Sequence, residues 1–141
     1  MTARLGLVIG ALLLLSCASY GQEECHQRFK SGEYKGFMAC TSFSLVILKD
    51  PFLIREAKGV VLLPGSEEPI PNVLVEFRDA DGKIKSTKTD SRGQFEFRRL
   101  REGTYMFKTT LSGFQSVIGT VVLHKSNKKS GAVRIEMPVG V

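Results

Sequence analysis

Short runs in which apolar and polar residues alternate fill the chain from about residue 57 onward. In residues 73–78, Val73, Val75 and Phe77 fall on one side and polar residues on the other. Residues 94–98 repeat this period of two with Phe95 and Phe97. Alternating runs bounded by Gly, Pro, Asn and Asp are typical of half-buried strands. The pattern therefore predicts strands joined by turns.

The other apolar runs are also short, and turn residues separate them. The expected strands are residues 43–48, 52–63 with an interruption around Lys58 and Gly59, 73–78, 83–89, 94–98, 104–111, 116–124 and 132–137. No stretch between them carries a convincing amphipathic helical period. Many short strands without helices predict an all-β sandwich.

The stretch from Thr89 to Tyr105 is expected to lie at the centre of this sandwich. It places a turn at residues 90–93 and another at 101–103 on either side of an alternating strand. In the first turn an Asp side chain can cap backbone amides, and Gly93 is free to adopt a left-handed conformation.

The amino-terminal residues predict export. Residues 1–21 carry Arg4, then the apolar run 5–15, then the small residues 16–19. A charged, then apolar, then small order is typical of a secretory signal peptide, and the apolar run is too short for a convincing membrane span. Residues 1–21 are therefore predicted to be a signal peptide.

Two cleavage sites compete within this segment. Leu14-Leu15-Ser16-Cys17 resembles a bacterial lipobox, in which Cys17 becomes the lipidated first residue. Ser19-Tyr20-Gly21 before Gln22 instead has small residues at the positions that an ordinary signal peptidase requires. The mature protein is expected to be periplasmic, secreted or lipid-anchored, depending on which site is used.

Both cleavage sites leave Cys25 and Cys40 as the other cysteines. An even pair in an exported protein predicts a disulfide, which would tie down a short N-terminal extension over residues 22–56. A metal site is not expected here, because His26 is the only nearby imidazole and no Cys-x-x-Cys pair is present.

The chain is basic, with a formal net charge of +6 and a sequence pI of about 9.4 over 141 residues. Its densest basic stretches are residues 98–101 and 125–129, which are each short and lie apart in the sequence. Scattered charge of this kind is first of all typical of a solvated surface. Nucleic acid is accordingly not an expected partner.

Candidate catalytic and metal-binding residues are few. The two histidines, His26 and His124, are distant in sequence and belong to no cluster with ligand spacing. Neither Asp79-x-Asp81-Gly82 nor Asp90-x-x-Gly93 has the full ligand series of a calcium loop, so both are interpreted as turns. The chain is expected to be neither an enzyme nor a binder of a cofactor or metal.

An intramolecular Lys–Asn isopeptide bond is not expected. Lys58 and Glu76 could serve as the lysine and the buried acid, but the expected last strand, 132–137, contains no Asn. The hypothesis is therefore rejected.

An ordered set of short motifs resembles the carboxypeptidase regulatory-like domain over about residues 57–138. The motifs are Gly59-Val60-Val61, Pro69-Ile70-Pro71-Asn72-Val73-x-Val75, Thr89-Asp90-x-x-Gly93-x-Phe95-x-Phe97, Leu100-x-x-Gly103-Thr104-Tyr105 and Gly113-Phe114. The resemblance implies a Greek-key, transthyretin-like sandwich of about seven strands, here over residues 57–141. The corresponding signature residues are Gly59, Pro71, Thr89, Asp90, Gly93, Phe95, Phe97, Gly103, Tyr105, Gly113 and Phe114. Within this pattern, Tyr105 is expected to bury its ring and satisfy its hydroxyl near a corner.

The same resemblance implies a non-catalytic accessory, structural or ligand-binding role. The expected function is therefore that of an exported binding or structural module in the bacterial cell envelope, whose partner is a protein or a glycan. Contact with a membrane is expected only through a lipid on Cys17. The alternative is a module that binds a carbohydrate or another small ligand.

Overall fold

The computed structural model describes Phe37 and residues 45–128 and 132–140 of the chain. The predicted signal peptide, Cys17 of the predicted lipobox and the proposed disulfide partners Cys25 and Cys40 lie outside the described residues. Among the described residues, no helix is long and apolar enough to cross a membrane.

The described residues form nine strands and no helix, which confirms the all-β prediction. The strands are β1 (Leu45–Ile47), β2 (Phe52–Ile54), β3 (Lys58–Leu62), β4 (Leu74–Arg78), β5 (Ile84–Lys88), β6 (Gln94–Glu96), β7 (Gly103–Thr110), β8 (Ser116–Leu123) and β9 (Val133–Glu136). The last seven, β3 to β9, fall within residues 57–141, whereas β1 and β2 precede them.

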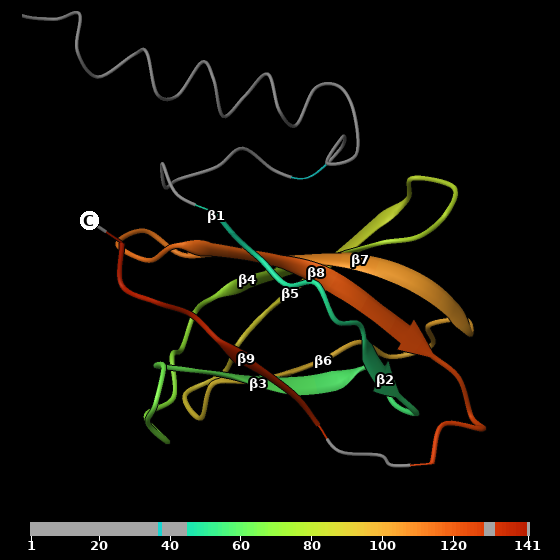
Figure 1. Ribbon diagram of the computed structural model, residues 1–141, viewed down its shortest axis with the longest axis horizontal. Helices are drawn as coiled ribbons and strands as arrows, with labels where there is room; N and C mark the ends of the chain where they lie inside the picture. Colours follow the sequence, from blue (N-terminus) through green and yellow to red (C-terminus); the bar gives the residue numbers. More distant parts are fainter. Residues whose placement is uncertain (1–36, 38–44, 129–131, 141) are drawn as a thin grey trace, which may run out of the picture.

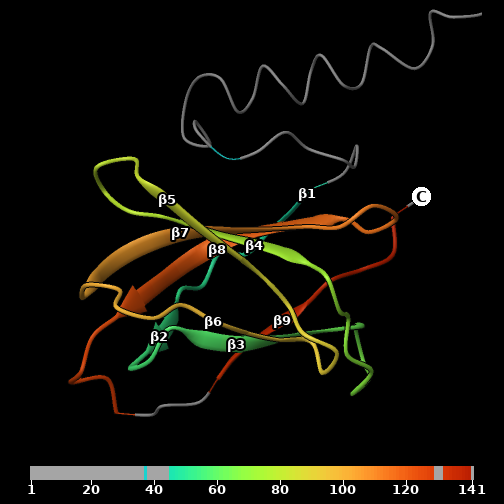
Figure 2. The same cartoon turned by 180° about the vertical axis from the view of Figure 1, so that it is seen from behind.

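The strands form two sheets that face one another as the layers of a sandwich (Figures 1 and 2). The larger sheet has the order β1-β8-β7-β4-β5, with β2 also paired to β8, and the smaller sheet has the order β6-β3-β9. β1 and β2 run parallel to β8 along the same edge, with Leu45 opposite Ser116 and Phe52 opposite Val121. The residues before the family-like region thus extend the larger sheet.

The interruption predicted around Lys58 and Gly59 is wrong. The chain leaves β2 after Ile54 and enters β3 at Lys58, so residues 55–57 carry it from the larger sheet to the smaller one. Gly59 lies inside β3 because the neighbouring strand approaches closely: a Cβ placed on it would lie 2.4 Å from the backbone oxygen of Val133. A glycine in a strand can mark such a close approach as well as a break.

The centre of the sandwich is an aromatic cluster around Phe77. Phe77 is 1% exposed, and the ring of Phe97 lies 4.4 Å from it, centroid to centroid. The rings of Phe95, Tyr105 and Phe107 lie at 6.3, 6.0 and 6.4 Å from the Phe77 ring. These residues come from both sheets, so their burial holds the two layers together.

A second, smaller apolar cluster lies on the outer face of the larger sheet. Phe37 packs on Ile118 of β8, and both side chains are almost fully buried. The guanidinium carbon of Arg78 lies 5.1 Å from the centre of the Phe37 ring, within the range of a cation–π contact. The outer face of this sheet is therefore partly covered.

The two ends of the sandwich are formed by different loops. At one end, the turn between β7 and β8 contacts the last described residues, where the Gly140 amide donates to the Gly113 oxygen. The loops of residues 55–57, 79–83, 98–102 and 124–128 all lie at the opposite end, as the strand registers require. We call this opposite end, defined by those four loops, the basic end.

Candidate functional site

The two acidic turn motifs use their carboxylates on their own backbone. Asp90 Oδ1 accepts hydrogen bonds of 2.9 Å from the amides of Arg92 and Gln94, and Gly93 has the left-handed φ of 69°. Asp79 Oδ1 accepts from the amides of Asp81 and Lys83 at the same distance. The structure thus confirms turn chemistry as the interpretation of both motifs.

Thr89 joins the loop before β4 to the end of β5. Its side chain is buried; the hydroxyl donates to the Ile70 oxygen at 2.8 Å and accepts from the Val73 amide at 2.9 Å. Because the hydroxyl both donates to and accepts from backbone groups, its role is to hold the fold together.

Tyr105 fills the corner position expected for it. Its ring is buried, and its hydroxyl donates to the Arg101 oxygen at 2.6 Å. Burial raises the pKa of the Tyr105 hydroxyl, and the nearby carboxylate of Asp79 acts in the same direction. The hydroxyl therefore stays protonated and tethers the β6–β7 loop.

The remaining signature residues are distributed over the molecule. Phe95 and Phe97 lie in the core, Pro71 is exposed before β4, Gly103 begins β7, and Gly113 and Phe114 lie in the turn between β7 and β8. The signature residues do not converge on one cavity. They build turns, close strand contacts and core.

His124 takes part in a surface network at the basic end. Its Nε2 lies 3.5 Å from Glu102 Oε2, and its Nδ1 contacts the hydroxyl of Ser126. Among the described residues, no three His, Cys, Asp or Glu side chains are grouped so that they could hold a metal ion. His26 lies outside the described residues.

A pair of charged residues that the alternation placed away from the core is nevertheless buried. Glu76 of β4 lies opposite Lys108 of β7, and the two residues are 1% and 0% exposed. Burial lowers the pKa of the Lys108 ammonium to about 8, against the opposing effect of the Glu76 charge.

Lys58, which was named with Glu76 as a candidate for an isopeptide bond, lies in the other sheet. Its ammonium pairs with the Glu56 carboxylate at 2.6 Å.

The lowered pKa of Lys108 predicts that the protein becomes more stable as pH rises from about 8 to 10.5. In this window the unfolded chain, with its ordinary lysine pKa, binds more protons than the folded one, so the free energy of unfolding increases with pH. The expected gain over the whole window is on the order of 2 kcal/mol. Urea unfolding at about pH 7.5 and 9.5 measures most of this gain in the free energy of unfolding. Both values lie below the ordinary tyrosine pKa of about 10, so tyrosine titration contributes little.

The matched control for this prediction is Lys108→Met, which keeps an apolar chain of similar length without the ammonium. The pH-dependent gain should disappear in this variant, whatever its absolute stability. An equal gain in both proteins would show that other groups cause it.

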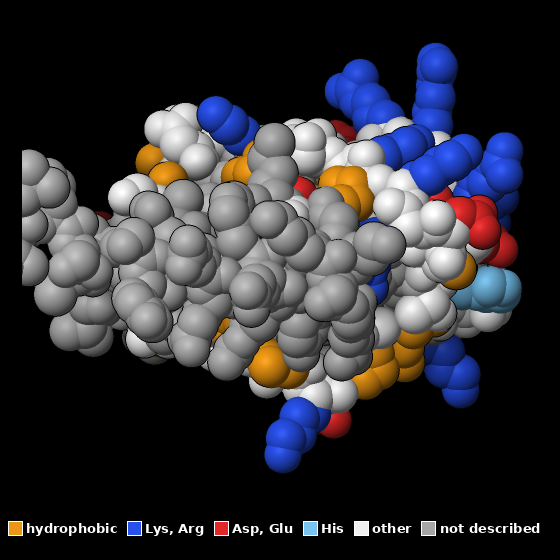
Figure 3. Space-filling view, turned by 90° about the horizontal axis from the view of Figure 1, so that it is seen from above, with side chains coloured by type: hydrophobic (Ala, Val, Ile, Leu, Met, Phe, Trp, Pro, Cys, Tyr) orange, Lys and Arg blue, Asp and Glu red, His pale blue; other side chains and the backbone are white. Residues whose placement is uncertain are grey.

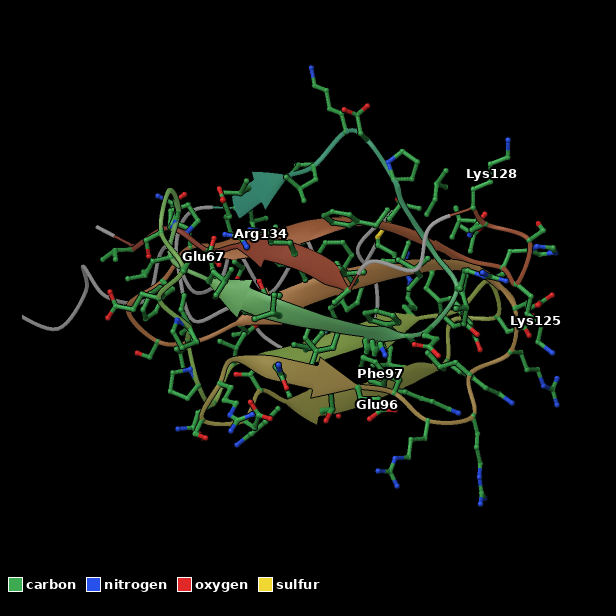
Figure 4. All side chains as sticks on the ribbon, turned by 90° about the horizontal axis from the view of Figure 1, so that it is seen from below. Glu67, Glu96, Phe97, Lys125, Lys128 and Arg134 are labelled. Carbon is green, nitrogen blue, oxygen red and sulfur yellow. The ribbon has the colours of Figure 1, made fainter. Side chains whose placement is uncertain are left out.

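The basic end brings together two stretches that are separate in the sequence. Arg98, Arg99 and Arg101 come from the loop after β6, and Lys125 comes from the loop after β8. Arg55 lies between the two stretches and donates from Nε to the Lys125 oxygen at 2.9 Å. Figure 3 shows many Lys and Arg side chains at the end that carries the pale-blue His124, and Figure 4 places Lys125 and Lys128 there, away from Glu67 and Arg134.

These loops enclose a groove of about 370 Å³. Its lining includes Arg55, Arg98, Arg99 and Lys125 together with Glu56 and Glu102. Sequence reasoning missed this site because nothing local shows that residues 98–101 and 125–128 become neighbours. The signal is the pairing of β7 with β8, which brings Gly103 opposite Leu123.

The fold and the distribution of the signature residues define the chain as an all-β sandwich module. The family model of the carboxypeptidase regulatory-like domain matches residues 57–137, and the chain belongs to this family. The resemblance inferred from the motifs is thereby confirmed.

Curated relatives support the same assignment. The chain is 40% identical over 82 residues to serine-aspartate repeat-containing protein E of Staphylococcus aureus strains MSSA476, USA300 and Newman. The match covers 55% of this chain but 7% of each relative. The similarity therefore concerns one module of much longer proteins.

Proposed function

We propose that the protein is an exported, non-enzymatic module that binds a partner or provides structural attachment in the bacterial cell envelope. The observation that carries this proposal is that the signature residues build turns and core, within a family described as regulatory-like. The signal-peptide pattern of residues 1–21 supports export. Cys17 supplies the attachment if the lipobox is used.

The second candidate is a module that binds a carbohydrate or another small ligand. A hollow of about 570 Å³ lies over β3 and β6, and its lining includes Lys58, Val60, Lys88, Asp90 and Gln94. A few convergent polar groups in a hollow are the features that orient a small ligand. This hollow is distinct from the groove of the basic end in its lining, apart from Lys58 and Glu96.

The export prediction is tested by expressing the full chain in a bacterium, separating cytoplasm from envelope and medium, and measuring the intact mass of the product. A start at Gln22 without acyl mass indicates a free exported protein, and a start at a lipidated Cys17 indicates an anchored one. Uncleaved protein confined to the cytoplasm would contradict export.

The binding role is tested by recovering partners from envelope fractions with the mature chain as bait and an unrelated β-sandwich of similar charge as the control. Recovery of a specific protein supports the first candidate, and recovery of a specific glycan supports a binding role under either candidate. Partners recovered equally by both baits count against either binding role and leave structural attachment.

A further inference from the structure

We propose that the basic end binds an anionic polysaccharide, through the carboxylate or sulfate groups that repeat along such a polymer. This inference rests on the proposal that the chain is a binding module, and it names the partner's chemistry. The binding groups in the groove are the guanidinium groups of Arg98 and Arg99, with Arg55 and Lys125 across it. Arg101 is exposed on the same loop and lines an adjoining hollow together with Arg99.

The charges of the sandwich are divided between its two ends. In the four loops of the basic end, Arg and Lys outnumber Asp and Glu: the cations are Arg55, Lys83, Arg98, Arg99, Arg101, Lys125 and Lys128, and the anions are Glu56, Asp79, Asp81 and Glu102. The loops at the other end, residues 63–73, 89–93, 111–115 and 137–140, carry Glu67, Glu68 and Asp90 against Arg92 alone. Such a distribution attracts a polyanion to one end of the molecule.

Three carboxylates of the basic end already have local partners. Asp79 caps its own turn, Glu56 pairs with Lys58, and Glu102 accepts from the Lys125 amide at 3.1 Å beside His124. In contrast, within the described part of the chain no ion pair involves Arg98, Arg99 or Arg101. The three arginines are exposed, so their guanidinium groups can meet a ligand without breaking an existing ion pair.

The loop that carries the arginines is held in a fixed bend. Arg99 has a φ of 60°, a left-handed conformation that costs a non-glycine residue roughly 1–2 kcal/mol. The bend is secured on one side by the Tyr105 hydroxyl on the Arg101 oxygen and on the other by the burial of Phe97. A loop fixed in this way loses little conformational entropy when a ligand binds.

Arginine is suited to the proposed ligand, because its planar guanidinium binds planar oxoanions through two parallel hydrogen bonds. Single-stranded nucleic acid is disfavoured, because the aromatic residues nearest these loops, Phe97 and Tyr105, are buried and offer no stacking surface. A bilayer is disfavoured because the large apolar side chains exposed among the described residues, Ile47, Leu53 and Val139, lie outside the four loops, so the basic end has none to insert.

The test measures binding of the purified mature chain to polygalacturonate and to dextran sulfate, with neutral dextran as the reference, at low and moderate salt. Wild type should bind at least one of the two anionic polymers, more weakly as salt increases, and should not bind neutral dextran. The two anionic polymers distinguish carboxylate from sulfate as the recognised group.

The variant Arg98→Gln/Arg99→Asn/Arg101→Gln should bind the anionic polymer at least about tenfold more weakly than wild type. Asn suits the left-handed position of residue 99, so this variant should fold.

The matched control is Lys49→Gln/Arg92→Gln/Arg134→Gln, which removes the same charge from exposed positions outside the four loops and outside the lining of the 570 Å³ hollow. It should keep its affinity within about threefold. Equal losses in the two variants would overturn the proposal, because net charge alone would then explain binding. Tighter binding to duplex DNA or to phosphatidylglycerol vesicles than to either polymer would also overturn it.

Failure of this test is distinguishable from failure of the proposed function. The polymer assay uses purified protein, whereas export and partner recovery are read from cell fractions. A chain that is exported and recovers a specific protein but binds neither anionic polymer would contradict only the inference about the basic end.

Discussion

Replacing Phe77 with alanine is expected to lower the free energy of unfolding by about 3–5 kcal/mol. The Phe77 ring is fully buried and contacts aromatic rings from both sheets, including Phe97 at 4.4 Å. Its removal takes away buried apolar area and leaves a cavity that the surrounding rigid rings fill poorly. Since single domains are typically stable by 5–15 kcal/mol, such a loss would bring the protein close to unfolding at moderate temperature.

Urea unfolding followed by circular dichroism measures this effect, with two control variants. Phe77→Leu keeps most of the volume and should cost clearly less than Phe77→Ala. Ile47→Ala removes an apolar side chain that is 55% exposed and should cost less than about 1 kcal/mol. A cost for Phe77→Ala as small as that for Ile47→Ala would show that the core is not centred on Phe77.

The alternation of apolar and polar residues is sufficient to predict most of the sandwich, because one face of a strand is buried regardless of its partner. Val75 and Phe77 in β4, and Phe95 in β6, are all in the core as this rule requires. The rule does not say to which sheet a strand belongs. It could therefore not show that residues 55–57 separate β2 from β3.

The burial of Glu76 and Lys108 could not be predicted by the same rule. Alternation indicates only that these side chains point away from Phe77 and Phe107, and a surface is the default for charged residues. The structure shows that the outer face of the larger sheet carries its own apolar contacts, such as Phe37 on Ile118. That contact joins residues far apart in the sequence, and no local pattern reports it.

The basic end likewise could not be predicted from local patterns, because it is built from segments far apart in the sequence. The two basic stretches were visible in the sequence but were too short to indicate a site by themselves. The pairing of β7 with β8 and the placement of Arg55 beside Lys125 bring them together. Local turn chemistry, in contrast, was predictable, because the Asp90 and Gly93 pattern needs only the residues within the turn itself.

Replacing Gly93 with alanine is expected to cost about 3 kcal/mol or more, for two separate reasons. Gly93 has a φ of 69°, which an alanine adopts only with strain. In addition, a Cβ at this position would lie 2.6 Å from the Val61 oxygen and 2.9 Å from Pro69 Cβ. The Gly93 oxygen accepts a 2.8 Å hydrogen bond from the Val61 amide, so relieving the clash would disturb the contact between the turn and β3.

Gly65→Ala separates the two contributions. Gly65 has nearly the same φ, 68°, but a Cβ there would meet nothing within 4 Å. This variant should therefore show only the backbone strain, about 1 kcal/mol, when both are measured by urea unfolding under the same conditions. Because the backbone term is common to both, the difference of about 2 kcal/mol measures how tightly the Asp90 turn packs against β3. Equal costs would mean that the turn can move away from β3 without loss, and that Gly93 is required only for its left-handed conformation.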